Sequence, residues 1–104
     1  YNTSKGAVSN FTRAVALDYR DTGVRVNAVC PSLTRSDLTE DMFDNQELMA
    51  KFAERIPMGR AAEAEEVADV ILFLASDDAR FVNGVNLPVD GGLSASNGQP
   101  PIHQ

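Results

Sequence analysis

The 104-residue sequence has few of the residues that build disulfides, metal sites and thiol chemistry. Its one cysteine, Cys30, cannot form an internal disulfide, so a reducing compartment such as the cytoplasm is expected. The only histidine, His103, lies in a proline-flanked tail, which disfavours a catalytic thiol–histidine pair. Cys30 also lies in an apolar run, where packing in the core is the simpler interpretation. We expect no metal site.

Positive charge in excess and long apolar runs are also missing. The net charge is −6, and the nine lysine and arginine residues are scattered, which argues against nucleic acid or an anionic membrane as a partner. No apolar run approaches the 18 or so residues of a membrane span, and no signal peptide is visible. No methionine precedes Tyr1, and we expect the chain to be the C-terminal part of a longer protein.

What is present predicts a folded α/β chain, with 43% hydrophobic residues. The spacing of apolar residues predicts a helix over 1–21, ended by Gly23. The run 24–30 predicts a strand, stopped by Pro31, whose apolar character is typical of a buried parallel sheet. The apolar stripe expected on the first helix consists of Val8, Phe11, Val15 and Tyr19.

The middle of the chain predicts a loop and short helices. Residues 31–37 are rich in serine and threonine and are expected to form a loop. Two weak amphipathic segments follow at 38–43 and 46–56; Asn45 is the expected N-cap of the second, and Pro57 should end it.

The last third predicts a helix and a strand. Apolar residues at helical spacing and three early glutamates predict a helix over 63–76. The run 85–89 predicts a strand, with Pro88 indicating an edge position or a bulge. A helix between two strands predicts that the strands are parallel.

Tyr1 and Lys5 are the first candidates for chemistry. Four positions apart, they lie on one face of a helix, about one turn from each other. A phenol has an ordinary pKa of about 10, and a nearby ammonium lowers it, so the pair could exchange a proton with a carbonyl or alcohol. By itself this motif is weak, because a solvent-facing pair on a helix looks the same.

Two further motifs follow strands. Pro31 turns the chain off the first strand, and the serine and threonine residues after it could bind a polar ligand at the carboxyl end of a parallel strand. An ordinary exit from a strand is an equal alternative. The run 90–92, Asp-Gly-Gly, follows the second strand, and a tight turn is its plain alternative.

Taken together, these residues closely resemble the short-chain dehydrogenase/reductase family. Within it, residues 30–33 and 94–100 are most similar to bacterial butanediol (acetoin/diacetyl) dehydrogenases. The matching residues, which occur in the family's order and spacing, are Tyr1 and Lys5, Arg25 to Val29 with Pro31, Gly59-Arg60, Glu65 to Ala68, Phe73 to Ser76, Val82-Asn83-Gly84 and Val89 to Gly92.

The resemblance implies the fold. Residues 1–104 would be the C-terminal portion of one Rossmann domain, a doubly wound parallel sheet, and would supply its last two strands with their helices. The nucleotide-binding N-terminal part, with the glycine-rich loop and the catalytic serine and asparagine, would be absent, so the chain alone is expected to be inactive. Residues 37–56 would form a substrate lid, in which Met42, Phe43 and Met49 could touch substrate or simply pack.

The resemblance also implies residue roles. Tyr1 would be the general acid or base, and Lys5 would hold the nicotinamide ribose and lower the pKa of Tyr1. The cofactor-binding residues would be these two together with Pro31, Ser32, Thr34 and Ser36. The family commonly has glycine where Ser32 stands and threonine where Ser36 stands.

The implied activity is hydride transfer between NAD or NADP, with NAD favoured, and a small alcohol or ketone such as butanediol or acetoin. A 3-oxoacyl thioester or a sugar is an alternative substrate. A different class of function also stays open, namely a non-catalytic oligomerisation or interaction fragment. The family resemblance implies a homotetramer or homodimer.

Overall fold

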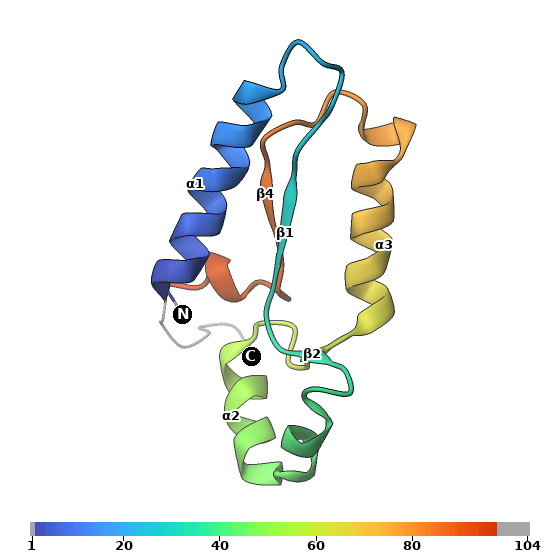
Figure 1. Cartoon of the computed structure of the whole chain (residues 1–104). Coiled ribbons are helices and arrows are strands. Elements are labelled where there is room, and N and C mark those ends of the chain that lie inside the picture. Colours follow the sequence, from blue (N-terminus) through green and yellow to red (C-terminus); the bar gives the residue numbers. More distant parts are fainter. Residues whose placement is uncertain (1, 98–104) are drawn as a thin grey trace.

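The computed structural model describes residues 2–97, and for residues 2–5 it describes the backbone alone. Within this part of the chain, ten elements follow one another (Figure 1). The helices are α1 (Asn2–Asp18), α2 (Gln46–Arg55) and α3 (Ala64–Ala75), with 3₁₀ turns at Glu40–Asp44, Asp77–Ala79 and Leu93–Ala95; the strands are β1 (Ala28–Pro31), β2 (Thr34–Arg35), β3 (Ala62–Glu63) and β4 (Asn86–Val89).

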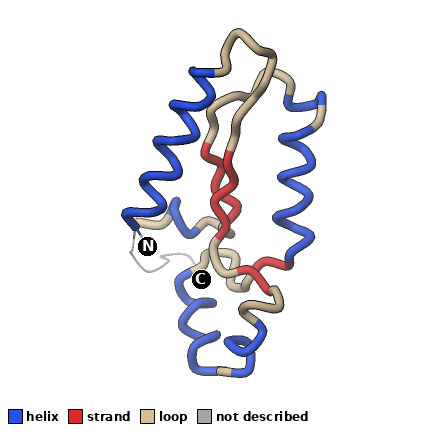
Figure 2. Tube along the Cα trace, in the orientation of Figure 1, coloured by secondary structure: helices blue, strands red, loops and turns tan. Residues whose placement is uncertain are grey.

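Two parallel strands form the centre of the fold. β1 pairs with β4, with Ala28 opposite Asn86 and Pro31 opposite Val89. The pair lies between α1 and α3, and a smaller unit of helices lies beyond its carboxyl end (Figures 1 and 2). The α/β class and the parallel arrangement of the last two long strands are therefore confirmed.

β1 is shorter than the strand expected over 24–30. Its regular pairing begins only at Ala28, because Val26 before it bonds to the Asn83-Gly84 turn and not to a neighbouring strand. The amide of Val26 donates to Oδ1 of Asn83 at 2.9 Å, and the carbonyl of Val26 accepts from the amide of Gly84 at 2.8 Å. The sequence pattern shows β-branched residues here but carries no sign of these distant partners.

A second, very short parallel sheet was missed. Thr34 lies opposite Ala62 and Arg35 opposite Glu63, inside the segment 31–37 that was expected to be a loop. Its two strands are two residues long and lie far apart in the sequence, so no local periodicity could indicate them.

The face of α1 that approaches the strands was also predicted incorrectly. Phe11 is 68% exposed and Val8 is 54% exposed, whereas Thr12 and Ala16 are buried. Small side chains permit the close approach: a Cβ added at Gly84 would lie 3.5 Å from Cβ of Ala16. α1 ends at Asp18, a little before the expected end.

The helices in the second half begin and end near the expected residues. Oδ1 of Asn45 accepts from the amide of Leu48 at 3.0 Å, which confirms Asn45 as the N-cap of α2. Ile56 ends that helix in an extended conformation before Pro57. Within residues 2–97, no helix is both long and apolar enough to cross a membrane.

The amino end of the strand pair is held by a dense polar cluster. The guanidinium of Arg25 donates to the carbonyls of Leu74 at 2.8 Å and Val82 at 3.1 Å. The amide side chain of Asn27 donates to the carbonyl of Val82 at 3.0 Å and accepts from the amide of Val85 at 3.0 Å. These residues fasten two segments to the start of β1, namely α3 and the segment that leads into β4. This part of the sequence motif therefore has a structural role.

Candidate active site

The carboxyl ends of β1 and β4 lie at the same end of the molecule as the start of α1 (Figure 1). The chain therefore brings the first turn of its first helix, where the backbone of Lys5 lies, toward the loops that follow both strands. Tyr1 and the side chain of Lys5 lie outside the described part of the structure. The roles expected for Tyr1 and Lys5 therefore stay a prediction.

A groove of about 550 Å³ opens at this end of the strands. It contains all four loop residues that the sequence nominated for cofactor contact, together with residues of the unit 37–56. The lining residues are Pro31, Ser32, Leu33, Thr34, Ser36, Leu38, Thr39, Phe52, Ile56 and Leu93. We call its serine and threonine residues the polar wall and its larger residues the apolar wall; such a mixed lining is common in small-molecule sites.

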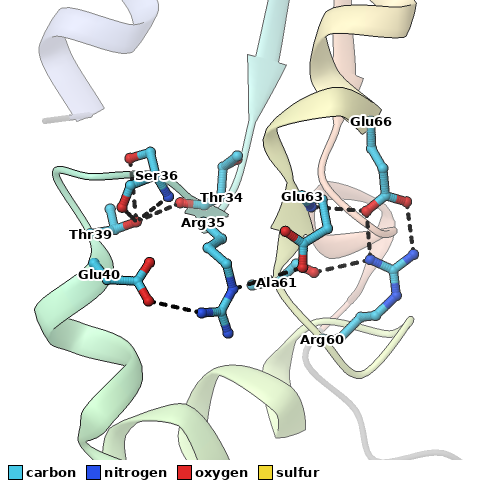
Figure 3. Close-up of polar contacts among 9 residues, drawn as sticks. All are labelled: Thr34, Arg35, Ser36, Thr39, Glu40, Arg60, Ala61, Glu63 and Glu66. Atoms are coloured by element: carbon cyan, nitrogen blue, oxygen red, sulfur yellow. Dashed lines mark hydrogen bonds and ion pairs between the residues drawn. The ribbon is translucent and has the colours of Figure 1, made fainter.

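Thr39, which sequence reasoning missed, organises the polar wall. Its hydroxyl donates to the carbonyl of Thr34 at 2.7 Å and accepts from the amide of Ser36 at 3.0 Å (Figure 3). The Ser36 hydroxyl lies 3.4 Å from the same oxygen. A serine followed three residues later by a threonine at the start of a helical turn is a signal for such local bonding, and it could have found Thr39.

The Asp-Gly-Gly motif forms a tight turn, as its plain interpretation had it. The carboxylate of Asp90 accepts from the amides of Gly92 at 3.1 Å and Ser94 at 3.0 Å. Hydrogen bonds from Ser94 and the Gly92 amide hold the pKa of Asp90 below its ordinary value. The hydroxyl of Ser32 donates to the carbonyl of Asp90 at 3.3 Å, so the two strand exits are joined.

This turn also receives the end of α2. A Cβ added at Gly91, where φ is +63°, would lie only 2.8 Å from Cγ2 of Ile56. The amide of Met58 donates to the carbonyl of Gly91 at 3.0 Å. Glycine is needed at position 91 for its backbone angle and for this close approach, and the contact fixes one end of residues 37–56.

Two of the three side chains suggested for substrate contact point elsewhere. Phe43 and Met49 line a different cavity of about 350 Å³, together with Arg35. The guanidinium carbon of Arg35 lies 4.0 Å from the centre of the Phe43 ring. Packing is therefore the better interpretation for these two residues, whereas Leu38 and Phe52 line the groove.

The titratable groups near the groove do not form a metal centre. Within residues 2–97, no group of three or more histidine, cysteine, aspartate or glutamate residues is placed to hold a metal ion. Cys30 is a free, half-buried residue of β1. The arrangement instead combines serine and threonine residues with larger apolar side chains, which is typical of a small-molecule site.

Comparison with known proteins identifies close relatives. The family model described as enoyl-(acyl carrier protein) reductase matches residues 1–94. Meso-2,3-butanediol dehydrogenase of Serratia marcescens is 60% identical over 102 residues, which are 98% of this chain and 40% of that enzyme. The chain thus spans well under half the length of that relative.

Solved structures of dehydrogenases also superpose on this chain. A 4-hydroxyisoleucine dehydrogenase complexed with NADH superposes with a TM-score of 0.87 at 32% identity, covering 91% of this chain and 39% of that one. A putative 2-deoxy-D-gluconate 3-dehydrogenase from Agrobacterium tumefaciens with bound NADP superposes with a TM-score of 0.85 at 33% identity, covering 92% of this chain and 39% of that one.

Proposed function

Because the chain belongs to the short-chain dehydrogenase/reductase family, we propose that the protein is an NAD- or NADP-dependent oxidoreductase acting on a small secondary alcohol or its ketone. The observation that carries this proposal is the 60% identity to a meso-2,3-butanediol dehydrogenase along nearly the whole chain. Butanediol and acetoin are accordingly the proposed substrate pair.

The fold class predicted from the sequence, part of a Rossmann domain with a doubly wound parallel sheet, is confirmed by the likeness to solved dehydrogenases. In such sheets, ligands bind beyond the carboxyl ends of the strands. The groove lies at that place in this chain, next to the loop that follows β1.

The groove has suitable groups for a nicotinamide. Pro31 and Leu33 offer an apolar surface to a flat ring, and Thr34 and Ser36 offer hydroxyl and backbone groups to a carboxamide. We propose that Pro31, Ser32, Thr34 and Ser36 contact the cofactor in this way. When bound, the nicotinamide would accept or donate the hydride, and the protein would position the substrate and move the proton.

Tyr1 is the proposed proton carrier. In alcohol oxidation its phenolate would take the hydroxyl proton while the hydride leaves the carbinol carbon; in ketone reduction the phenol would return that proton to the oxygen. Lys5 would lower the pKa of Tyr1 through its positive charge and would hold the ribose of the cofactor.

Residues 37–56 are proposed to be the substrate lid. Leu38 is 96% exposed beside the groove, and Phe52 and Ile56 form part of its apolar wall. Closure of this unit would remove water from the groove and complete the pocket around the substrate.

We further propose a cytoplasmic homodimer or homotetramer. A single cysteine suits a reducing compartment, and exposed apolar side chains such as Leu72 on α3, at 70%, provide surface for subunit contact. Light scattering on the purified protein tests the assembly, and a monomer at micromolar concentration contradicts it.

A sugar derivative is the second candidate substrate, because the similar structure from Agrobacterium tumefaciens is a putative 2-deoxy-D-gluconate 3-dehydrogenase. The 3-oxoacyl thioester stays an alternative, and the names of the relatives favour an enzyme over an interaction fragment.

The test is a spectrophotometric assay of the protein together with any sequence that its gene encodes ahead of Tyr1. Absorbance of NADH or NADPH is followed with meso-2,3-butanediol, acetoin, gluconate derivatives and a 3-oxoacyl thioester. We expect turnover with the butanediol pair, and Tyr1→Phe should lower kcat by about 10²- to 10⁴-fold. Tyr19→Phe, which changes the exposed tyrosine just beyond the far end of α1, is the matched control.

Full activity in Tyr1→Phe contradicts the role of Tyr1. Turnover with none of the substrates under either cofactor contradicts the proposed function.

A further inference from the structure

Arg35 is the one charged residue in the loop segment that the sequence nominated for cofactor contact, and no role was expected for it. It lies in β2 between Thr34 and Ser36, two of the proposed cofactor-contacting residues. Its backbone pairs in register with Glu63, the residue that precedes α3. The position of its side chain is therefore tied to the geometry of the cofactor loop.

The side chain of Arg35 reaches three neighbours on two different units, of which Glu40 and Glu63 are drawn in Figure 3. Its Nη1 lies 3.1 Å from Oε1 of Glu40, and its Nε lies 3.8 Å from Oε1 of Glu63. Its guanidinium also stacks 4.0 Å from the centre of the Phe43 ring. Glu40 and Phe43 belong to the first turn of the unit 37–56, whereas Glu63 belongs to the domain.

These contacts occur at the start of the unit 37–56, the first of the two places where it joins the rest of the chain. There the Thr39 hydroxyl is also bonded to Thr34 and Ser36 of the cofactor loop. At the other place, Ile56 and Met58 are held against Gly91 by close packing and a backbone hydrogen bond. That second attachment is apolar and tight. The attachment through Arg35 is polar and more than two-fifths exposed, with 43% of its side-chain surface accessible.

We propose that Arg35 is a positioning residue that holds the entrance of the lid against the cofactor loop. An exposed ion pair and a cation–π contact are each weak and can be broken, so the segment from Glu40 onward can move away from the cofactor loop while Thr39 and Ile56 stay held. This inference rests on the proposed function for its kinetic consequences, but its structural content does not depend on it.

Arginine suits this role better than lysine does. Its planar guanidinium can stack on a ring while its edge nitrogens pair with carboxylates on both sides, whereas an ammonium can supply only the point charge. The Arg35→Lys variant should therefore keep part of the lid attachment that the Arg35→Gln variant loses. The ion pairs should weaken with salt, while the stacking on Phe43 should weaken less.

The first measurement is independent of activity. Backbone hydrogen exchange of residues 37–45 is measured in the protein and in Arg35→Gln, where we expect it to be about 5- to 20-fold faster. Glu40→Gln should give part of this effect, and the double variant should exchange no faster than Arg35→Gln alone. Arg55→Gln is the matched control, because Arg55 is an exposed arginine of α2 without an ion pair among residues 2–97.

The second measurement separates positioning from general damage. In the butanediol assay, Arg35→Gln should raise KM about fivefold or more and change kcat about twofold or less, with an intermediate KM for Arg35→Lys. The global unfolding midpoint should stay close to that of the parent protein.

Unchanged exchange over 37–45 in Arg35→Gln overturns the proposal, as does full additivity in the double variant. Faster exchange without any dehydrogenase activity would support the lid attachment and contradict the proposed function, so the two failures are distinguishable.

Discussion

The two ends of the β1–β4 pair use polar residues in different ways. At the amino end, Arg25, Asn27 and Asn83 bond to backbone groups that the strands and α3 leave unpaired. At the carboxyl end, Thr34 and Ser36 bond to the Thr39 hydroxyl, and they also line an open groove. The contacts at the first end join β1 to α3 and to the segment that leads into β4, whereas those at the second join the loop after β1 to the start of residues 37–56.

This difference separates two kinds of motif that look alike in a sequence. The Arg25–Asn27 segment and the Asn83-Gly84 turn match the family pattern as well as the loop after Pro31 does. The contacts in the structure show that the former fasten α3 and the segment that leads into β4 to β1, although Arg25 and Asn27 also line a cavity of about 540 Å³. The latter lies at the groove beyond the carboxyl ends of the strands. Variants at the two ends should therefore affect different measurements.

The largest effect on stability is expected from Arg25→Met. Methionine keeps an apolar stem but removes the donors to the carbonyls of Leu74, Ser76 and Val82. Because charge-assisted hydrogen bonds would be lost and carbonyls left unpaired, the free energy of unfolding should fall by about 2–4 kcal/mol. Urea unfolding measures this, with Arg13→Met, on the exposed surface of α1, as control.

The comparison would break if Arg25→Met lowered kcat/KM of the folded enzyme and left the urea midpoint unchanged. Arg25 would then act on the groove and not on the fold.

Gly91→Ala should have the next largest effect, and Gly84→Ala gives the matched contrast. Both glycines have positive φ, +63° and +78°, but an added Cβ would lie 2.8 Å from Ile56 at the first and 3.5 Å from Ala16 at the second. We expect about 2–3 kcal/mol of destabilisation at Gly91 and about 1 kcal/mol at Gly84. Thermal and urea unfolding measure both, and equal losses would argue against the close contact with Ile56.

Thr39→Val tests the groove end directly. Valine keeps the shape of threonine but removes the hydroxyl that bonds to Thr34 and Ser36. The KM for the cofactor should rise about 3- to 10-fold, with little change in the unfolding midpoint, and Thr39→Ser should preserve the parent value. Thr22→Val is the control, since the Thr22 hydroxyl makes a local bond to Tyr19 at the far end of the molecule. A fall in stability without a change in KM would place Thr39 with the structural residues.

The smallest effect concerns pH. The guanidinium of Arg60 bonds to Glu66 at 2.7 and 2.8 Å and, with the amide of Glu63, lowers the pKa of Glu66 from 4.5 to about 2 (Figure 3). The unfolded chain therefore binds a proton that the folded chain does not, and this contribution to stability is present above pH 4.5 and is lost as the pH falls toward 2. Because the pair is exposed to solvent, the contribution should be small.

Urea unfolding at several pH values between 5 and 2 measures that dependence. Glu66→Gln should show a shallower fall in stability than the parent protein. Parallel curves for the two would contradict a lowered pKa at Glu66.

The sequence predicted those features that depend on neighbours close in the chain. Asn45 caps α2, and Pro57 follows its end, because both effects act within one turn of helix. The α/β class and the parallel strands follow from the order of elements. The features it missed depend on distant partners: the β2–β3 pairing, the late start of β1 at Ala28, and the burial of Thr12 and Ala16 instead of Phe11.

The same division holds for the candidate site. The family resemblance nominated Pro31, Ser32, Thr34 and Ser36 in the loop after a predicted strand, and all four line one groove. Thr39 and Arg35 were not nominated, because their importance lies in which atoms they contact. The direction of Phe43 away from the groove was equally invisible in the sequence.

By itself, the sequence determined the α/β class and the order of helices and strands, since local periodicity and turn residues act through neighbours along the chain; its ordered motifs carried the resemblance to the family. The tertiary structure alone decided which motif residues bond across the fold and which line the groove. That decision depends on hydrogen bonds and close approaches between residues such as Arg25 and Leu74, or Gly91 and Ile56, which are far apart in sequence and meet only after folding.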